Sequence, residues 1–171
     1  MKIRRTIKSL CMTSFVLLNS LGVAQATSAV ANMQANATLN PTCSMSATDV
    51  HFTGYVPSGT PGNYNWGVVA TGTLTINLSC TTGTSPVLSL NGGNTHNAMT
   101  PSMQGTGSNT DLLAYRVKTG VRIFGDGSGT TTTVTIPSPA TGTYNYPVIL
   151  PLNQYVTPDS YSDTLTLTAT Y

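Results

Sequence analysis

The sequence predicts an all-β protein built as a β-sandwich with Greek-key connections. Apolar residues recur at every second position in short runs, which is the period of a half-buried strand. Clusters of Gly, Pro and Asn separate these runs, and the chain beyond residue 26 is rich in Thr and Ser and lacks a helical pattern. Short strands separated in this way favour a sandwich over a barrel.

Residues 1–26 have the pattern of a secretory signal peptide. Basic residues precede a short apolar run over residues 10–23, and Ala24-Gln25-Ala26 fits a cleavage site of the A-x-A type. The apolar run is too short to span a bilayer. We therefore expect a secreted protein whose mature chain runs from Thr27 to Tyr171.

The charged residues of the mature chain argue against several functional classes. Its basic residues are Arg116, Lys118 and Arg122, against five acidic residues, all Asp, so the expected net charge is negative and nucleic acid is not an expected partner. The chain beyond the signal peptide has no Glu, only His51 and His96 as histidines, and no known catalytic or nucleotide-binding motif. We expect no enzyme activity, no cofactor and no metal site.

The first strand predicted in the mature chain covers residues 29–39. It contains no turn, and no second apolar run is close enough to pair with it as a tight hairpin. We therefore expect this strand to find its sheet in another copy of the protein. The alternative is that it forms the first strand of its own complete sandwich. Its inward positions are Ala29, Ala31, Met33, Ala35, Ala37 and Leu39.

Two cysteines remain after signal cleavage, Cys43 and Cys80, and both fall at inward positions of predicted strands. In an oxidising compartment they can pair in only one way, so we expect a disulfide. A metal or redox pair would need closer spacing or more ligands. The predicted strands after residue 40 are 43–52, 72–80, 86–91, 111–118, 121–124, 131–137, 144–150 and 161–171.

The strand predicted over residues 161–171 has the clearest alternation. Threonines occupy one face, and apolar residues occupy the other, with Asp163 as the exception. Because this strand reaches the last residue, we expect nothing after it to cover its free edge, which is normally an aggregation risk. The apolar face consists of Tyr161, Leu165, Leu167, Ala169 and Tyr171.

Several segments, taken in order along nearly the whole mature chain, carry a family resemblance. They include Cys43-Ser44-Met45-Ser46, the run from Gly72 to Cys80, Phe124-Gly125-Asp126-Gly127, and the block that begins Tyr161-Ser162-Asp163-Thr164-Leu165. With these segments the chain resembles the spore coat protein U domain family, which includes the pilin subunits of archaic chaperone–usher pili.

This resemblance implies an incomplete immunoglobulin-like Greek-key β-sandwich that is completed by a donor strand from another chain. After the signal peptide over residues 1–26, it implies an N-terminal donor-strand extension over 27–40 and a pilin domain over 41–171. A periplasmic chaperone would fill the open groove first, and at an outer-membrane usher the donor strand of another pilin subunit would replace it. The implied acceptor edge, which also contacts the chaperone, is Leu165, Leu167, Ala169 and Tyr171.

The implied function is a non-enzymatic structural subunit of a bacterial surface fibre, with roles in adhesion and biofilm formation. A second hypothesis is a coat protein that self-assembles on a spore or cell surface. A third is a soluble sugar-binding module, in which Trp66 with Tyr55 and Tyr64 would form an aromatic surface.

Overall fold

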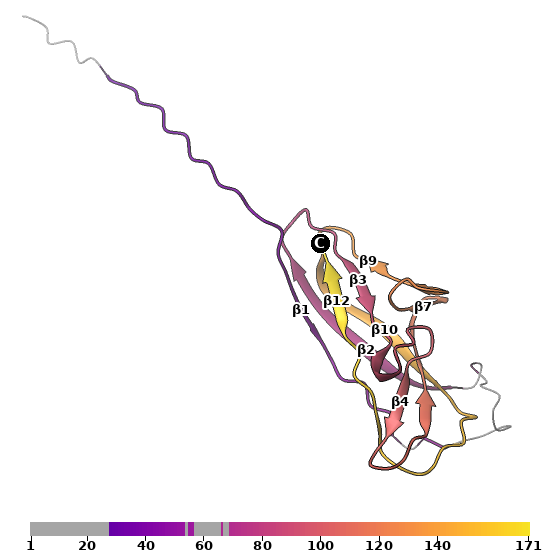
Figure 1. The fold of residues 1–171 in the computed structure, drawn as a ribbon. Helices are drawn as coiled ribbons and strands as arrows, with labels where there is room; N and C mark the ends of the chain where they lie inside the picture. The colour runs from indigo at the N-terminus through magenta and orange to yellow at the C-terminus, as the bar shows by residue number, and fades with distance from the viewer. Residues whose placement is uncertain (1–27, 54, 57–65, 67–68) are drawn as a thin grey trace, which may run out of the picture. The chain divides into compact units, whose positions relative to one another are not determined.

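The computed structural model describes residues 28–53, 55–56, 66 and 69–171, and these residues form an all-β fold, as predicted (Figure 1). No helix in this part of the chain is long and apolar enough to cross a membrane. The elements are β1 Cys43–Ala47, β2 Val69–Cys80, β3 Val87–Leu90, the 3₁₀ helix η1 Gly93–Thr95, β4 Ser102–Gly105, β5 Leu112–Ala114, β6 Arg116–Thr119, β7 Arg122–Phe124, β8 Thr131–Thr132, β9 Val134–Thr135, β10 Thr141–Pro151, β11 Tyr161–Ser162 and β12 Leu167–Thr170.

The strands form one large sheet and two small ones. The large sheet has the order β1-β2-β10-β6-β7-β8, and the small sheets have the orders β11-β4-β5 and β12-β3-β9. Alternate residues of the long strand β2 point inward, and side chains from all three sheets share one core, as the predicted sandwich requires. The buried core residues are Leu74, Ile76, Leu78, Leu88, Leu90, Leu113, Tyr115, Val117, Phe124, Ile136, Ala140, Tyr146, Val148 and Leu150.

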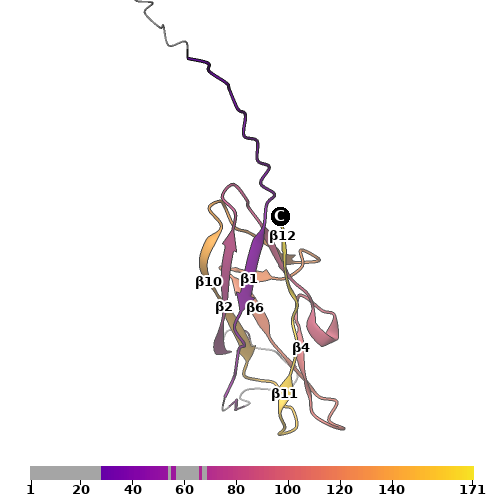
Figure 2. The same ribbon diagram turned by 90° about the vertical axis from the view of Figure 1, so that its left-hand side faces the viewer.

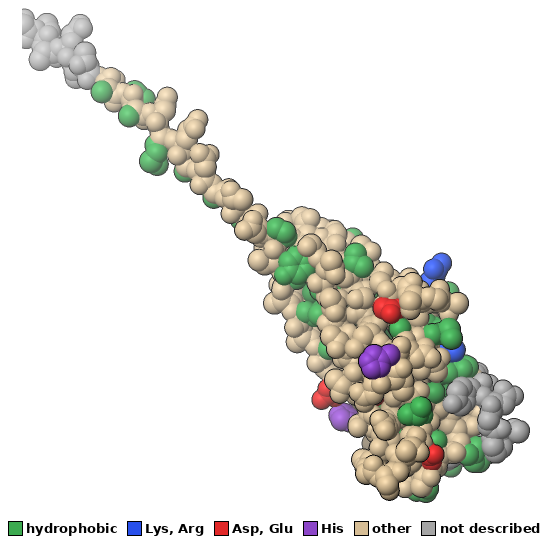
Figure 3. Space-filling view, viewed as in Figure 1, with side chains coloured by type: hydrophobic (Ala, Val, Ile, Leu, Met, Phe, Trp, Pro, Cys, Tyr) green, Lys and Arg blue, Asp and Glu red, His purple; other side chains and the backbone are tan. Residues whose placement is uncertain are grey.

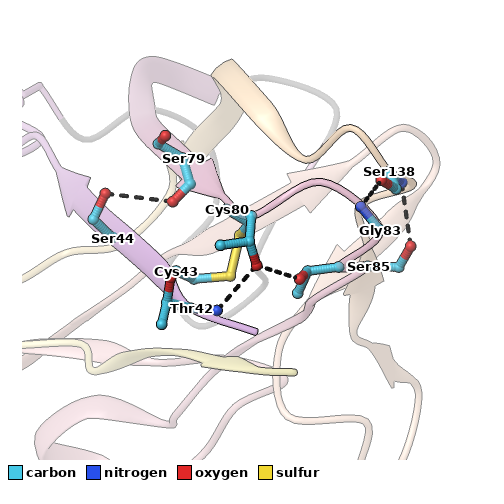
Figure 4. Close-up of a disulfide and its surroundings, with 10 residues drawn as sticks. Thr42, Cys43, Ser44, Ser79, Cys80, Gly83, Ser85 and Ser138 are labelled. Atoms are coloured by element: carbon cyan, nitrogen blue, oxygen red, sulfur yellow. Dashed lines mark hydrogen bonds between the residues drawn. A yellow bond between two sulfur atoms is a disulfide. The ribbon is translucent and has the colours of Figure 1, made fainter. Parts of the chain in front are cut away.

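A disulfide joins Cys43 of β1 to Cys80 of β2 (Figure 4). The two residues lie directly opposite each other in the antiparallel pair, with their Cα atoms 4.1 Å apart. In the neighbouring pair, the N–H of Thr81 donates to the carbonyl of Thr42 at 2.9 Å. Because hydrogen-bonded and non-hydrogen-bonded pairs alternate, the cysteines occupy a non-hydrogen-bonded pair, in which the two strands approach most closely. The disulfide therefore fixes one end of β1, the edge strand, to its interior neighbour β2.

Three predicted strands are each divided in two, because the chain changes sheets within them. In the 111–118 segment, β5 pairs with β4 whereas β6 pairs with β10. In the 131–137 segment, β8 pairs with β7 and β9 pairs with β3. The 161–171 segment divides into β11, which pairs with β4, and β12, which pairs with β3. Strand β4 was not predicted, because Met103 is its only apolar side chain and a single apolar residue cannot show an alternating pattern.

The predicted strand over residues 29–39 is not formed within one chain. The chain divides into two parts, Met1–Ala37 and Thr38–Tyr171. Residues 28–42 have no strand pairing and all of them are exposed, and Met33 and Leu39 are among the most exposed apolar residues described. The insertion of this segment into another copy therefore stays a prediction. The expected signal peptide over residues 1–26 lies outside the described residues.

A candidate strand-acceptor groove

Strand β12 pairs with β3 along one edge only. The N–H of Asn91 donates to the carbonyl of Thr166 at 3.1 Å, and the pairing continues to Thr170. Main-chain groups of successive residues point to opposite sides of a strand. The N–H and C=O groups of Leu165, Leu167 and Ala169 therefore point away from β3. Within the described residues, no strand pairs with this edge.

A second free edge belongs to strand β1, and it lies beside β12 (Figure 2). The N–H of Thr48 donates to the carbonyl of Thr75 in β2 at 3.0 Å. By the same alternation, the main-chain groups of Met45 and Ala47 point away from β2. Among the strands that the structure describes, β2 is the only partner of β1. Two unpaired strand edges thus face one gap in the sandwich.

The chain continues along this gap beyond β1, although the predicted strand 43–52 ends at Ala47. Val50 and Phe52 are half-buried and pack against the core. A side chain at Gly72 of β2 would place its Cβ only 2.5 Å from Cγ1 of Val50, so this glycine allows the segment after β1 to approach β2 closely. Residues 48–52 therefore extend the wall that β1 begins.

Two adjoining cavities occupy the gap between residues 47–55 and residues 156–167, and we call them together the acceptor groove. The first has a volume of about 560 Å³ and has Leu113 and Leu150 in its lining. The second has a volume of about 380 Å³, and its lining includes core residues from both layers. Val50, His51, Phe52, Met103 and Tyr161 line both cavities. Half-buried apolar side chains such as Val50, Phe52 and Met103 are therefore partly exposed along this groove. The core residues beneath them, among them Leu113 and Leu150, are buried.

The structure brings three of the four predicted acceptor-edge residues together. Leu165, Leu167 and Ala169 are half-buried, pack against the core and share the free edge of the β12 segment. Leu165 and Leu167 also line the second cavity. Tyr171 lies beyond β12 and is 54% exposed. Val50, Phe52 and the rest of this wall were not predicted as part of a groove, because the inward positions change from odd (Cys43, Met45) to even (Val50, Phe52) after β1 ends, so no single alternation runs through residues 43–52.

Asp163 lies on the core side of the acceptor segment, where the alternation pattern places an apolar residue. Its carboxylate accepts hydrogen bonds from the N–H of Asn94 at 2.7 Å, the N–H of Thr164 at 2.8 Å and the hydroxyl of Tyr115 at 2.8 Å. Burial, followed by the hydrogen bond to Asp163, raises the pKa of Tyr115 above its usual range, so this hydroxyl stays protonated and donates. The charge on the core face is thus satisfied by three donors.

Asp159 anchors the other end of the acceptor segment to the β4–β5 hairpin. Its carboxylate accepts hydrogen bonds from the hydroxyl and N–H of Thr106, from the side chain of Asn109 at 2.9 Å and from the N–H of Ser160 at 2.7 Å. Hydrogen bonds from Thr106, Asn109 and Ser160, in that order, lower the pKa of Asp159 to about 2. The wall of the first cavity is therefore fixed by these side-chain contacts as well as by the short pairing of β11 with β4.

The aromatic residues of the sugar-binding hypothesis make contacts within the protein. The guanidinium carbon of Arg116 lies 3.8 Å from the centroid of the Trp66 ring, so one face of that ring is covered. The hydroxyl of Tyr55 donates to the carbonyl of Pro151 at 2.8 Å and lines the first cavity. Tyr64 lies outside the described residues. In the described part of the chain, no group of three or more acidic, His or Cys side chains could hold a metal ion.

These features define a β-sandwich with an open groove between two free strand edges. A family model described as the Spore Coat Protein U domain matches residues 29–168, and the chain belongs to this family, as the sequence resemblance predicted.

Comparison with solved structures gives the same fold. A matching chain is found in the crystal structure of the CsuC–CsuE chaperone–tip adhesion subunit pre-assembly complex from the archaic chaperone–usher Csu pili of Acinetobacter baumannii. It has a TM-score of 0.51 and 18% sequence identity, and the match covers 78% of this chain and 41% of that chain. The protein thus spans about two fifths of the length of its structural neighbour. No curated protein matches the chain.

Proposed function

We propose that the protein is a structural pilin subunit of a secreted bacterial surface fibre and that it polymerises by donor-strand exchange. The observation that carries this proposal is the acceptor groove, in which two unpaired strand edges flank cavities lined by core residues. An extended strand in this groove would pair with the free edge of β12 and cover the core, which is the physical basis of β-augmentation. The polymer would support adhesion and biofilm formation.

In this proposal the occupant is the N-terminal segment of another copy. Residues 28–40 contain no charged residue and no proline, and they are exposed in the single chain. Hydrophobic side chains recur along this segment in the space-filling view (Figure 3). The inserted side chains would be Ala29, Ala31, Met33, Ala35, Ala37 and Leu39.

The sizes of these side chains match a groove with two cavities. Met33 and Leu39 are the only large ones, and six residues of extended strand place them about 20 Å apart. The small alanines at the other inward positions would suit a shallow, narrow groove. Burying all six side chains would contribute on the order of 10 kcal/mol at ~25 cal/mol per Å². That figure is an upper bound because the free segment is not fully extended in solution.

The assembly route follows from the need to cover an open groove. The structural neighbour is a chaperone–tip adhesion subunit complex that exists before assembly. By extension, a periplasmic chaperone fills the groove of this protein first, and exchange for the donor strand of the next subunit takes place at an outer-membrane usher. Residues 1–26 direct export, residues 27–40 form the donor extension, residues 41–171 form the pilin domain, and the fibre is displayed at the cell surface.

The test compares unheated and boiled samples on a denaturing gel. The full-length protein is expressed with its chaperone and usher, beside a variant that lacks residues 29–39. We expect a ladder of heat-labile polymers from the full-length protein and a monomer from the deletion variant. A stable, folded monomer from both would refute donor-strand exchange. A ladder that forms without chaperone and usher would instead favour the self-assembling coat protein that the family description suggests.

A further inference from the structure

The acceptor segment is interrupted in the middle of the groove. Strand β11 ends at Ser162 and β12 begins at Leu167. The partner strands are interrupted at the same level, because β3 ends at Leu90, β4 begins at Ser102, and η1 lies between them. Residues 163–165 therefore have no partner strand in either small sheet to keep them extended.

Two side chains take the place of the missing strand pairing. The carboxylate of Asp163 accepts from the main-chain N–H of Asn94 in η1 at 2.7 Å and from the hydroxyl of Tyr115 at 2.8 Å. The side-chain oxygen of Asn91 accepts from the N–H of Thr166 at 2.7 Å. Each end of the interrupted segment is thus joined to the loop that follows β3.

The loop is shaped around the Asp163 carboxylate. Gly93 has a φ of 60°, a conformation that L side chains rarely adopt. A Cβ at Gly93 would lie 2.2 Å from Oδ2 of Asp163, which is far inside van der Waals contact. The glycine therefore permits both the turn and the close approach of the carboxylate.

We propose that Asp163 is a positioning residue for strand insertion. It holds residues 163–166 extended across η1, so that the free edge from Ser162 to Ala169 is continuous and can pair with one inserted strand. An apolar side chain at this inward position would bury more apolar surface but could not accept the N–H of Asn94 or the hydroxyl of Tyr115. This inference rests on the proposed donor-strand exchange, in which the occupant is the N-terminal segment of a second copy.

The test compares three variants of the full-length protein, each expressed with chaperone and usher. Asp163→Ala removes all the bonds of the carboxylate. Asp163→Asn keeps an oxygen for Asn94 and an amide that can donate to the Tyr115 oxygen. Asp126→Ala is the matched control, because Asp126 also accepts from a main-chain N–H and a hydroxyl but belongs to the loop after β7. The measurements are the heat-labile ladder and hydrogen exchange of the chaperone-bound subunit.

We expect Asp163→Ala to reduce the polymer fraction at least tenfold and to speed amide exchange in residues 163–169, while the amides of β2 and β10 stay protected. Asp163→Asn and Asp126→Ala should polymerise within about threefold of the wild type.

Three results would overturn the proposal while leaving donor-strand exchange intact, provided that the wild type forms its ladder. The first is Asp163→Ala polymerising as well as Asp126→Ala. The second is an equal loss of protection in β2 and β10, which would make Asp163 a general stability residue. The third is a loss of polymer in Asp163→Asn as complete as in Asp163→Ala. That result would show that the hydrogen bonds to Asn94 and Tyr115 are not what holds the segment. A wild type that forms no ladder refutes donor-strand exchange itself, and the positioning role with it.

Discussion

Replacing both cysteines by serine is the perturbation whose magnitude follows most directly from the structure. The disulfide joins Cys43 and Cys80 across 37 residues of chain. On the chain-entropy model, closing a loop of this length with a disulfide lowers the entropy of the unfolded state. This raises the free energy of the unfolded state by about 4 kcal/mol. Folded proteins of this size are stable by only ~5–15 kcal/mol. The bond therefore supplies a large share of the stability of a sandwich whose groove is open.

The assay is urea unfolding of the mature chain followed by circular dichroism. With a slope of ~2 kcal/mol per M, removing the disulfide should lower the midpoint by about 2 M. Reduction of the wild type by dithiothreitol should give the same shift, which separates loss of the bond from any effect of the serine side chains. A shift below about 0.5 M in both experiments would refute the chain-entropy argument. It would mean that pairing between β1 and β2 alone constrains the segment.

Three further predictions concern the donor segment, the acceptor wall and the loop after β3. Met33→Ala removes one of the two large inserted side chains, so its polymers should dissociate at a lower temperature than those of the outward-facing control Gln34→Ala, by an amount corresponding to ~2–3 kcal/mol. Asp159 has its pKa lowered from 3.8 to about 2 by its hydrogen bonds, so its stabilisation is complete above pH 4 and is lost as pH falls through 2; acid unfolding of Asp159→Asn should lack that step. Gly93→Ala should destabilise more than Gly83→Ala, because both have positive φ but only Gly93 faces a clash, and equal urea midpoints would contradict this.

The sequence predicted which residues face the core better than it predicted which strands pair. Alternation identified the inward residues of β2 and of the 161–171 segment, because the side-chain period of a strand is fixed by its backbone. Alternation continues unchanged when an extended chain moves from one sheet to another, so the divisions near Tyr115, Thr133 and Asp163 were not visible. The pairing of a strand depends on residues distant in sequence, which no local pattern records.

The acceptor groove shows the same limit. The predicted edge residues Leu165, Leu167 and Ala169 were accessible to sequence analysis because they belong to one alternating run. The opposite wall was not, since residues 48–52 form no regular strand and lie against β2 partly because Gly72 has no side chain. A groove is formed by two segments that are distant in sequence, and the alternation pattern identified only one of them.

Asp163 illustrates why an exception to a pattern can be more informative than the pattern. An inward charge in a core strand costs free energy unless donors satisfy it. Here the donors come from Tyr115 and from the N–H of Asn94, which is available because η1 interrupts the neighbouring strands. The exception in the alternation thus coincides with the point where the acceptor segment lacks a partner strand. In the proposed exchange the unpaired edge must stay extended until another strand arrives, and the half-buried carboxylate of Asp163, bonded to η1, would hold it there without occupying the edge itself.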